Sequence, residues 1–469
     1  MSGIPSTSGT AGPKDEFFQE LLEKTPIIEA IVRSQLGVHK CRVAHRDAWG
    51  CGGSHVAIPC RLTPNRSVYF RLPVPDAVGE KGNPGNVNEC ISTQIASYLW
   101  IHENCPDVPI PTLHSFGLDD GSVFTHPSNT PFWARLRWRV KRLIRFLRGA
   151  AKPISHILRT SRHQLGHGFL ITSAAQGDSV ALSWLERCGN AAYRQNLFRG
   201  LARAQLSLAA IPFPRIGCLS LQRDASIALT NRPLTAYILD AEMKGAVPSI
   251  PRHRTYGASS VYIEDLISLQ DNLLRSQKNA MDSADDGQRQ LAALTMLRAT
   301  AHLFTSEEFR EGPFPFMFTE MHMPNIFTDE LGNVETIIDV ETAALPREML
   351  TTPRWLLLGR HEACSEMTPR DMLDEYLAIF TDETNRLAVE SVKRYPGNEG
   401  AIQRVWFFSA VTMPGAMYYL FNRYIQPLFN KEHPDSSEFD EAVYSYWSLD
   451  AEAFINQKLR ERKSDESSL

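Results

Sequence analysis

The sequence predicts an α+β protein in which a small, sheet-containing part is followed by a larger, mainly helical part. Between about Cys41 and Gly117, β-favouring runs and turn-forming residues surround one helical period. From Ala181 onward, apolar residues recur mostly at helical spacing. The chain has 469 residues, 43% of them hydrophobic, so it is long enough for two domains or one large two-part protein.

The small part can be assigned in order along the chain. A glycine-rich connection at 50–54 precedes two expected strands around 56–58 and 68–70. Asn83-Pro84-Gly85-Asn86 then breaks the chain before a helix with Ile91, Ile95, Tyr98 and Leu99 on one face. Further short strands are expected at 113–117 and 168–172.

The larger part is predicted to hold helices at 264–274 and 290–304, with an acidic loop at 279–287 between them. Short strands are expected at 314–318 and 334–338. The apolar stretch 405–421 is short for a membrane span and contains Pro414-Gly415, so it predicts a buried helix pair or a kinked helix, and no transmembrane segment.

Composition excludes some classes of partner. Charged residues make up 22% of the chain and the formal net charge is -4, so nothing global indicates nucleic acid. Residues 1–13 lack the basic and apolar regions of a secretory signal and are expected to form a disordered leader. The eight cysteines include no CxxC pair, which predicts reduced thiols and a cytoplasmic protein.

The segment from Phe318 to Glu341, FTEMHMPNIFTDELGNVETIIDVE, carries candidate chemistry. Glu320 is followed five residues later by Asn325, and after an expected hairpin turn an apolar strand ends in Asp339. Phosphoryl transfer needs such a set, because a base orients the acceptor hydroxyl and oxygen ligands hold Mg²⁺ at the phosphates. An ordinary hairpin with acidic turn residues would explain the same pattern taken alone.

The surrounding sequence, FREGPFPFMFTEMHMPNIFTDELGNVETIIDVETAALPREM, resembles the catalytic stretch of the aminoglycoside phosphotransferase family, especially its divergent fungal-type branch. The resemblance extends to Phe70-Arg71-Leu72-Pro73, to the NPGNVNE helix start and to the NCPDVPIP turn, and it covers roughly residues 41–360. It implies a protein-kinase-like bilobal fold, with an antiparallel sheet in a small N-lobe and a larger, mainly helical C-lobe.

The implied division begins with a disordered leader and first helix over 1–37. An N-lobe over 38–176 follows, with a basic helical insert at 132–152. The C-lobe spans 177–430 and contains a catalytic-loop-like hairpin at 318–341, and a C-terminal helix and polar tail fill 431–469.

The resemblance also implies ATP and Mg²⁺ as cofactors and a hydroxyl of an unknown small molecule as acceptor. The positions that match the family's metal ligands and the acid after them are Asn325, Asp339 and Glu341. The catalytic positions are Glu320, as the base, and His322. The nucleotide-binding positions are Gly52, Gly53, Ser54, Arg71 and Gln94.

Three positions depart from the family pattern. Glu320 stands where aspartate is usual, Arg71 where lysine is usual, and Gln94 where a glutamate pairs with that lysine. Gln94 could still accept a hydrogen bond from Arg71. The extra methylene of Glu320 moves its oxygens by about a bond length, which can cost ~100-fold in rate. A nucleotide-binding pseudokinase or scaffold, with impaired or no phosphotransfer, is therefore the alternative to an active phosphotransferase.

The basic segment 132–148, FWARLRWRVKRLIRFLR, contains seven basic residues and no acidic one. Its apolar residues fall on one helical face, and such faces generally pack inward, so we expect a helix packed on the protein with a solvated basic face. The alternatives are weak contact with an anionic membrane surface, a calmodulin-type target, a nuclear signal, or a site that gathers phosphorylated substrate.

Overall fold

The computed structural model describes residues 13–149, 153–160, 163–350, 353, 355–358, 367–389, 392, 398–431 and 437–466. Residues 1–12 of the predicted leader, 150–152 of the predicted insert and the tail from 467 lie outside the described residues. The chain divides into two compact units, described separately below. The first unit comprises 1–95, 112–174 and 223–226, and the second comprises 96–111, 175–222 and 227–469.

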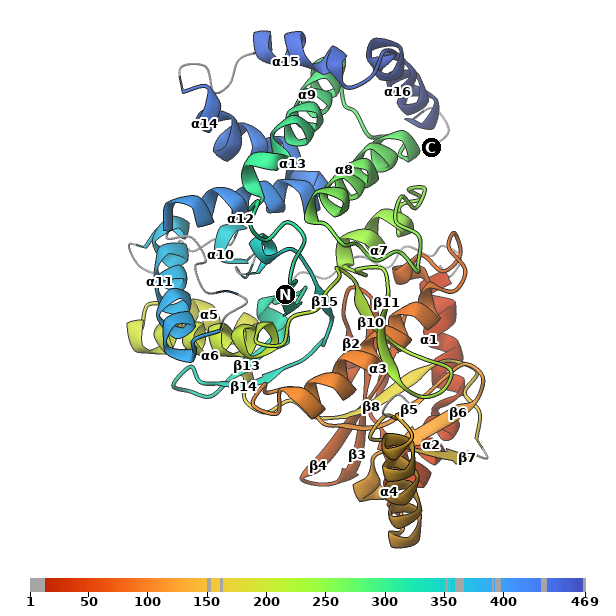
Figure 1. Cartoon of the computed structure of the whole chain (residues 1–469). Coiled ribbons are helices and arrows are strands. Elements are labelled where there is room, and N and C mark those ends of the chain that lie inside the picture. Colours follow the sequence, from red (N-terminus) through yellow and green to blue (C-terminus); the bar gives the residue numbers. More distant parts are fainter. Residues whose placement is uncertain are drawn as a thin grey trace. The chain divides into compact units, whose positions relative to one another are not determined.

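Within the described residues, the first unit contains an eight-stranded sheet in the order β1-β3-β4-β8-β5-β6-β7, with β2 paired to β3 (Figure 1). Every pairing is antiparallel, which confirms the antiparallel sheet expected in this part. The strands are β1 (Arg42–Val43), β2 (Gly50–Cys51), β3 (His55–Thr63), β4 (Arg66–Pro73), β5 (Leu113–Gly117), β6 (Ser122–Thr125), β7 (Ile157–Thr160) and β8 (Phe169–Ser173).

Alternation of side chains along β3 and β4 builds the core of the first unit. Val56, Ile58 and Cys60 of β3 are fully buried, and the apolar residues of β4 recur at the same spacing of two. These residues share one hydrophobic cluster with buried side chains of two N-terminal helices, α1 (Pro13–Glu23) and α2 (Thr25–Leu36). The N-terminal helices therefore belong to the folded core of this unit.

The second unit is mainly helical, as expected. The predicted helices at 264–274 and 290–304 correspond to α8 and α9, and the apolar stretch 405–421 forms α12, a 3₁₀ turn at Pro414–Ala416 and α13. Its helices are α5 (Val180–Arg187), α6 (Ala191–Ala209), α7 (Ala236–Met243), α8 (Ser259–Ser276), α9 (Ala284–Thr300), α10 (Trp355–Leu358), α11 (Pro369–Leu387), α12 (Asn398–Thr412), α13 (Met417–Leu420), α14 (Gln426–Phe429), α15 (Ser437–Val443) and α16 (Ala451–Glu466). Two further α-helices of the described residues are α4 (Phe132–Leu147), in the first unit, and α3 (Asn86–Asn104), which begins in the first unit and ends in the second.

The prediction of an acidic loop at 279–287 is wrong for its last four residues, which form the first turn of α9. The hydroxyl of Ser283 caps this helix by accepting a hydrogen bond from the backbone N–H of Asp286. Asp285 and Asp286 lie in the first turn, where negative charge interacts favourably with the helix dipole. The acidic residues thus mark the beginning of a helix.

Short antiparallel sheets complete the second unit. β10 pairs with β11, β12 pairs with β15, and β13 lies between β9 and β14. Their bounds are β9 (Asp178–Ser179), β10 (Cys218–Leu221), β11 (Ile227–Asn231), β12 (Phe316–Phe318), β13 (Ile326–Thr328), β14 (Val334–Ile337) and β15 (Thr342–Ala344). The β10–β11 hairpin was not anticipated from the sequence.

The structure bears on two further predictions, the absence of a transmembrane segment and the reduced state of the cysteines. Among the described helices, none is both long and apolar enough to span a bilayer. The expectation of reduced cysteines is wrong at Cys188, which is disulfide-bonded. The other described cysteines are thiols: Cys41, Cys51, Cys60, Cys90, Cys105 and Cys218.

A buried ion pair joins Arg232, the residue after β11, to Glu242 of α7 in the second unit. The Arg232 and Glu242 side chains are 2% and 1% exposed, and two N–H groups of the guanidinium donate to the two carboxylate oxygens at 2.5 and 3.1 Å. Arg232 also donates to the carbonyl of Ile250 at 3.0 Å. The bidentate geometry satisfies both charges, so removal of either one leaves its partner buried without its counter-charge.

We expect Glu242→Ala to lower the free energy of unfolding by about 3–5 kcal/mol, because it leaves the Arg232 charge buried. Asp240→Ala is a matched control on the same helix: Asp240 pairs with Lys244 at 2.7 Å, but both side chains are about two-fifths exposed. An exposed pair of this kind contributes below ~1 kcal/mol. Equilibrium unfolding in urea measures both losses, and equal losses would contradict the prediction.

Candidate functional site

Strand pairing in the second unit brings Glu320 and Glu341 to neighbouring chain segments. β12 and β15 are antiparallel, with Phe318 opposite Thr342. Just beyond this pair, the backbone N–H of Thr319 donates to the carbonyl oxygen of Glu341 at 3.0 Å. Glu320, which follows β12, and Glu341, which precedes β15, therefore lie at the same end of the two-stranded ladder.

The β13–β14 hairpin likewise brings Asn325 and Asp339 to neighbouring chain segments. Ile326 pairs with Ile337, and the backbone N–H of Ile338 donates to the carbonyl oxygen of Asn325 at 2.8 Å. Because Asp339 follows Ile338 directly, the amide of Asn325 and the carboxylate of Asp339 originate from adjacent strand ends. The hairpin predicted from the sequence is confirmed.

The turn of this hairpin is stabilised by Asp329. One carboxylate oxygen accepts from the backbone N–H groups of Leu331 and Asn333, and the other accepts from the Asn333 side-chain amide at 2.8 Å. These hydrogen bonds, the Asn333 side-chain bond foremost, hold the pKa of Asp329 below its usual value. A tight turn of this kind fixes the register that aligns Asn325 with Ile338.

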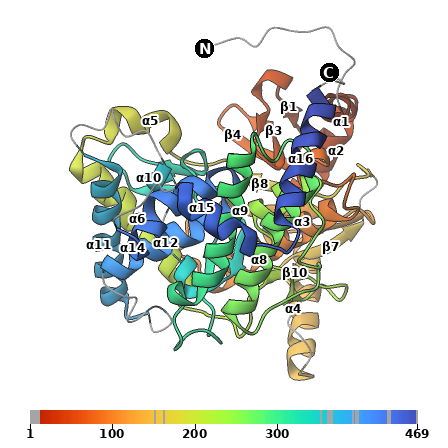
Figure 2. The ribbon, with the colours of Figure 1, turned by 90° about the horizontal axis from the view of Figure 1, so that it is seen from above.

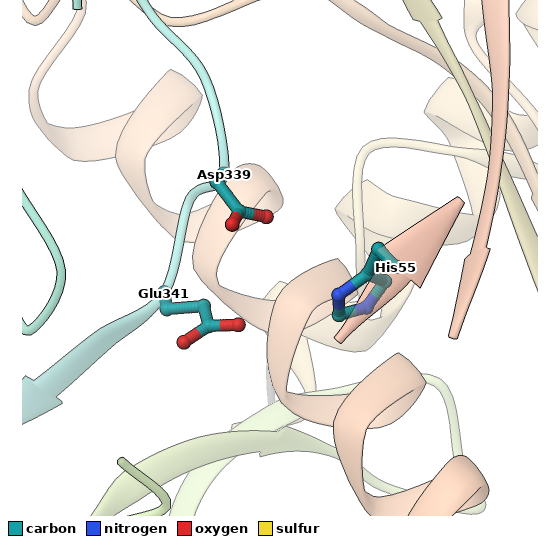
Figure 3. A group of neighbouring side chains, drawn as sticks. All are labelled: His55, Asp339 and Glu341. Atoms are coloured by element: carbon teal, nitrogen blue, oxygen red, sulfur yellow. The ribbon is translucent and has the colours of Figure 1, made fainter. Parts of the chain in front are cut away.

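Asp339 has an unusual backbone conformation, with φ at 59°. Non-glycine residues seldom adopt this left-handed region, although Asp and Asn tolerate it best, and strained residues cluster at functional sites. Its carbonyl oxygen accepts from the N–H of Glu341 at 2.8 Å, and the two carboxylates project from the segment between β14 and β15 (Figure 3). One carboxylate oxygen of Asp339 lies within 4.8 Å of one from Glu341. Carboxylate oxygens are among the ligands that Mg²⁺ prefers in proteins.

The Glu320 carboxylate is buried and held by a histidine. Its Oε2 lies 2.5 Å from Nε2 of His322, whose own side chain is 48% exposed. A cavity of about 70 Å³ in the second unit borders both residues. Its polar lining includes Gln205, Thr235, Tyr262, Thr319 and Thr412. A cavity of this size accommodates a hydroxyl-bearing group, whereas sites for whole drug-sized ligands measure roughly 300–1,000 Å³.

The residues that line this cavity from outside the 318–341 segment were missed by sequence reasoning. Gln205 lies on α6, and its side-chain oxygen accepts from the backbone N–H of Phe318 at 3.0 Å, which ties the helix to β12. Tyr262 lies on α8, and Thr235 precedes α7. They are more than fifty residues from Glu320, and no local spacing marks them.

Gly52, Gly53 and Ser54, the predicted phosphate-binding residues, form the turn between β2 and β3 in the first unit. The backbone N–H of Gly52 donates to the carbonyl of His55 at 2.9 Å, which closes the turn. Both glycines are exposed, and neither has a left-handed φ. A Cβ added at Gly53 would meet no atom within 4 Å. The conformation and packing of this turn therefore do not require glycine at position 53.

Arg71 and Gln94 are both buried in the first unit, on β4 and α3. Arg71 lies opposite Ala57 of β3 and Leu170 of β8. The side-chain amide of Gln94 is buried, and neither its nitrogen nor its oxygen has a hydrogen-bond partner within the described part of the chain. The hydrogen bond from Arg71 to Gln94 considered from the sequence is therefore not formed, and Arg71 has other interaction partners.

The chain was compared with protein families, curated proteins and solved structures. No family model and no curated protein matches the chain. The chain is structurally similar to the GDP and kanamycin complex of APH(2")-IIia, with 13% identity and a TM-score of 0.41 over 90% of this chain and 99% of that one. It is also similar to the AMP-bound spectinomycin phosphotransferase APH(9)-Ia, with 12% identity and a TM-score of 0.37 over 91% and 98%. A third match is the macrolide 2′-phosphotransferase MphH from Brachybacterium faecium, with 11% identity and a TM-score of 0.35 over 89% and 97%.

All three matches are remote. Their identities of 13% or less and TM-scores below 0.5 carry no argument about the activity or substrate of this chain.

Proposed function

We propose that this chain is an ATP-dependent phosphotransferase that acts on a hydroxyl of a small molecule, and that its two units correspond to the small and large lobes of a protein-kinase-like fold. One observation in the second unit supports the proposal most directly. Two antiparallel strand pairs bring Asn325, Asp339 and Glu341 to adjoining strand ends, together with the buried acid Glu320. An amide, two carboxylates and a potential base are the groups that phosphoryl transfer requires.

The chemistry of the donors fits Mg²⁺. Asn325 would supply an amide oxygen, and Asp339 and Glu341 would supply carboxylate oxygens that already lie within 4.8 Å of each other. All of these are hard oxygen donors, the kind of ligand that Mg²⁺ prefers. Bound there, Mg²⁺ would neutralise charge on the nucleotide phosphates.

The first unit offers candidate contacts for the nucleotide. Without side chains at Gly52 and Gly53, a phosphate can approach the backbone of the β2–β3 turn closely. Arg71 retains the positive charge of the lysine that the family carries there, with a planar fork suited to phosphate oxygens. The side-chain amide of Gln94 is buried and has no hydrogen-bond partner among the described residues. Each buried polar group without a partner costs about 1–3 kcal/mol of stability, and a hydrogen bond to a bound polar group would remove this cost.

Glu320 is the proposed base. In the transfer, the acceptor oxygen forms a bond to the γ-phosphorus, the bond from that phosphorus to the bridging oxygen of ADP breaks, and the hydroxyl proton moves to the Glu320 carboxylate. His322, at 2.5 Å, would orient this carboxylate. The 70 Å³ cavity beside both residues would receive the hydroxyl-bearing end of the acceptor.

A second candidate function is nucleotide binding without transfer, as in a pseudokinase or scaffold. The contact between Glu320 and His322 favours it, because a carboxylate engaged by an imidazole is less available to an acceptor hydroxyl. Glutamate in place of aspartate favours it too, as does the amide of Gln94, which has no hydrogen-bond partner among the described residues. The two functions share the metal-binding residues and differ only at the base.

We expect ATP with Mg²⁺, at about 100 times its Kd, to raise the melting temperature by roughly 3 °C. Asp339→Asn should abolish the rise without unfolding the protein, because asparagine also tolerates the left-handed backbone but lacks the charge. Glu335→Gln removes a charge from an exposed position on neighbouring β14 and should keep the full rise. An equal rise in all three proteins, or one that persists in EDTA, would contradict the assigned metal ligands.

Gly53→Ala should leave the melting temperature unchanged, since the added Cβ meets no atom within 4 Å, but it should weaken ATP binding by about tenfold as the methyl group obstructs the phosphates. Gly189→Ala is the matched control, because Gly189 is also exposed, without a left-handed φ and without neighbours within 4 Å of a Cβ. Isothermal titration gives both affinities. Unchanged affinity in Gly53→Ala would remove the β2–β3 turn from the nucleotide site.

Glu320→Gln should lower the Mg²⁺-dependent release of ADP from ATP by about 10²–10⁴-fold, the usual contribution of a general base, while nucleotide binding persists. Glu320→Asp should raise the rate, since it returns the carboxylate to the position usual in the resembling family. ADP release is measured with a coupled assay. If neither the natural chain nor Glu320→Asp releases ADP although nucleotide still raises the melting temperature, the binding-only function is correct.

A further inference from the structure

Helix α4 presents its apolar face to solvent. The large apolar side chains of this face are between 41% and 75% exposed: Phe132, Trp133, Leu136, Val140, Leu143, Ile144 and Leu147. At 100° per residue they form one continuous stripe, which we call the α4 stripe. The sequence-based expectation that this face packs inward is therefore wrong.

The opposite, basic face of α4 is turned toward its own unit. It borders a cavity of about 830 Å³ against β6, β7 and residues 223–225, which Trp133, at the edge of the stripe, also lines. The basic face contributes Arg137, Trp138, Lys141, Arg142 and Arg145 to this lining. The carboxylate of Asp224 accepts a hydrogen bond from Arg145 at 2.8 Å. Because both side chains are at least one-third exposed, this ion pair adds little to stability. The helix therefore faces its own unit with its basic side, and the stripe lies outward.

In both ribbon views α4 projects beyond the strands of its own unit (Figures 1 and 2). Contiguous exposed apolar surface of this extent on a globular protein marks a contact site. The stripe is flanked by the exposed cations Arg137, Arg139 and Arg148, and residues 132–148 contain seven basic residues and no acid. The occupant of the stripe should therefore be apolar in its interior and anionic at its surface.

We propose that α4 docks this protein on the surface of a membrane that contains anionic phospholipids. The stripe would enter the boundary between headgroups and acyl chains, with Trp133 at the interface, and the flanking arginines would contact the phosphates. A flat bilayer needs only one face of the helix, which is the face that is available. A groove of the calmodulin type would surround the helix, but the basic face is already turned toward its own unit. A second copy would bring two strongly cationic helices together.

The docking surface is independent of the proposed phosphotransfer, because every residue it uses lies outside the 318–341 segment and the β2–β3 turn. Nucleotide binding and membrane binding can therefore fail separately in experiment.

The test is co-sedimentation of the full chain with vesicles of phosphatidylcholine and phosphatidylserine, compared with vesicles of phosphatidylcholine alone. We expect binding to the anionic vesicles that weakens as salt is raised. Leu136→Glu together with Leu143→Glu should lower the partition coefficient by about tenfold or more, because two charges would enter the apolar boundary. Leu182→Glu with Leu185→Glu, on exposed leucines of α5, is the matched control and should bind as the natural chain does.

A charge variant provides a second, independent measurement. Arg139→Gln with Arg148→Gln should weaken binding to anionic vesicles by roughly fivefold for each basic residue removed. The proposal is overturned by absence of binding to the anionic vesicles, by equal binding to neutral vesicles, or by loss of binding in the α5 control pair alone. Two other results would also overturn it, each in the absence of vesicle binding. One is binding to calcium-loaded calmodulin that the two stripe substitutions abolish, and the other is dimerisation in light scattering that they abolish.

Discussion

Two backbone hydrogen bonds hold the candidate site together: Thr319 N–H to the Glu341 carbonyl, and Ile338 N–H to the Asn325 carbonyl. Each extends a strand pair by one step beyond its regular ladder. Together they position two acidic chain segments side by side, although their carboxylates repel one another. The geometry of the acids is thus set by neutral main-chain bonds, which do not depend on a ligand or on the charge of the side chains.

The position of Asp339 illustrates the cost of this arrangement. Its left-handed backbone lets the chain turn sharply from β14 toward β15, so that Asp339 and Glu341 project from the same short segment. A residue of this type is tolerated there because its short polar side chain suits the conformation. Glu320 has a different constraint, since a buried carboxylate needs a polar partner and His322 provides one. The contact with His322 that stabilises the buried Glu320 carboxylate therefore competes with its proposed contact to an acceptor hydroxyl.

The sequence predicts the local parts of this structure well. The β13–β14 hairpin was predictable because Asp329, Gly332 and Asn333 are turn formers between two apolar runs. The pairing of β12 with β15 was not, nor were Gln205 and Tyr262 beside Glu320, since they depend on contacts far apart along the chain. For α4, the periodicity correctly predicted an apolar face and a basic face. It did not predict which of the two is exposed to solvent, because amphipathicity does not show which face packs on the rest of the protein. The beginning of α9 was also missed, because the acidic residues after Ser283 were expected to lie in a loop.

The seven positive charges of the α4 segment have a consequence for the protein in free solution. Two copies of this helix repel each other over a Debye length, about 8 Å at physiological ionic strength, and the repulsion keeps their apolar stripes apart. Added salt screens that repulsion, and sulfate or phosphate salts also strengthen apolar association. Salt therefore weakens a barrier to association between two copies through the α4 stripe.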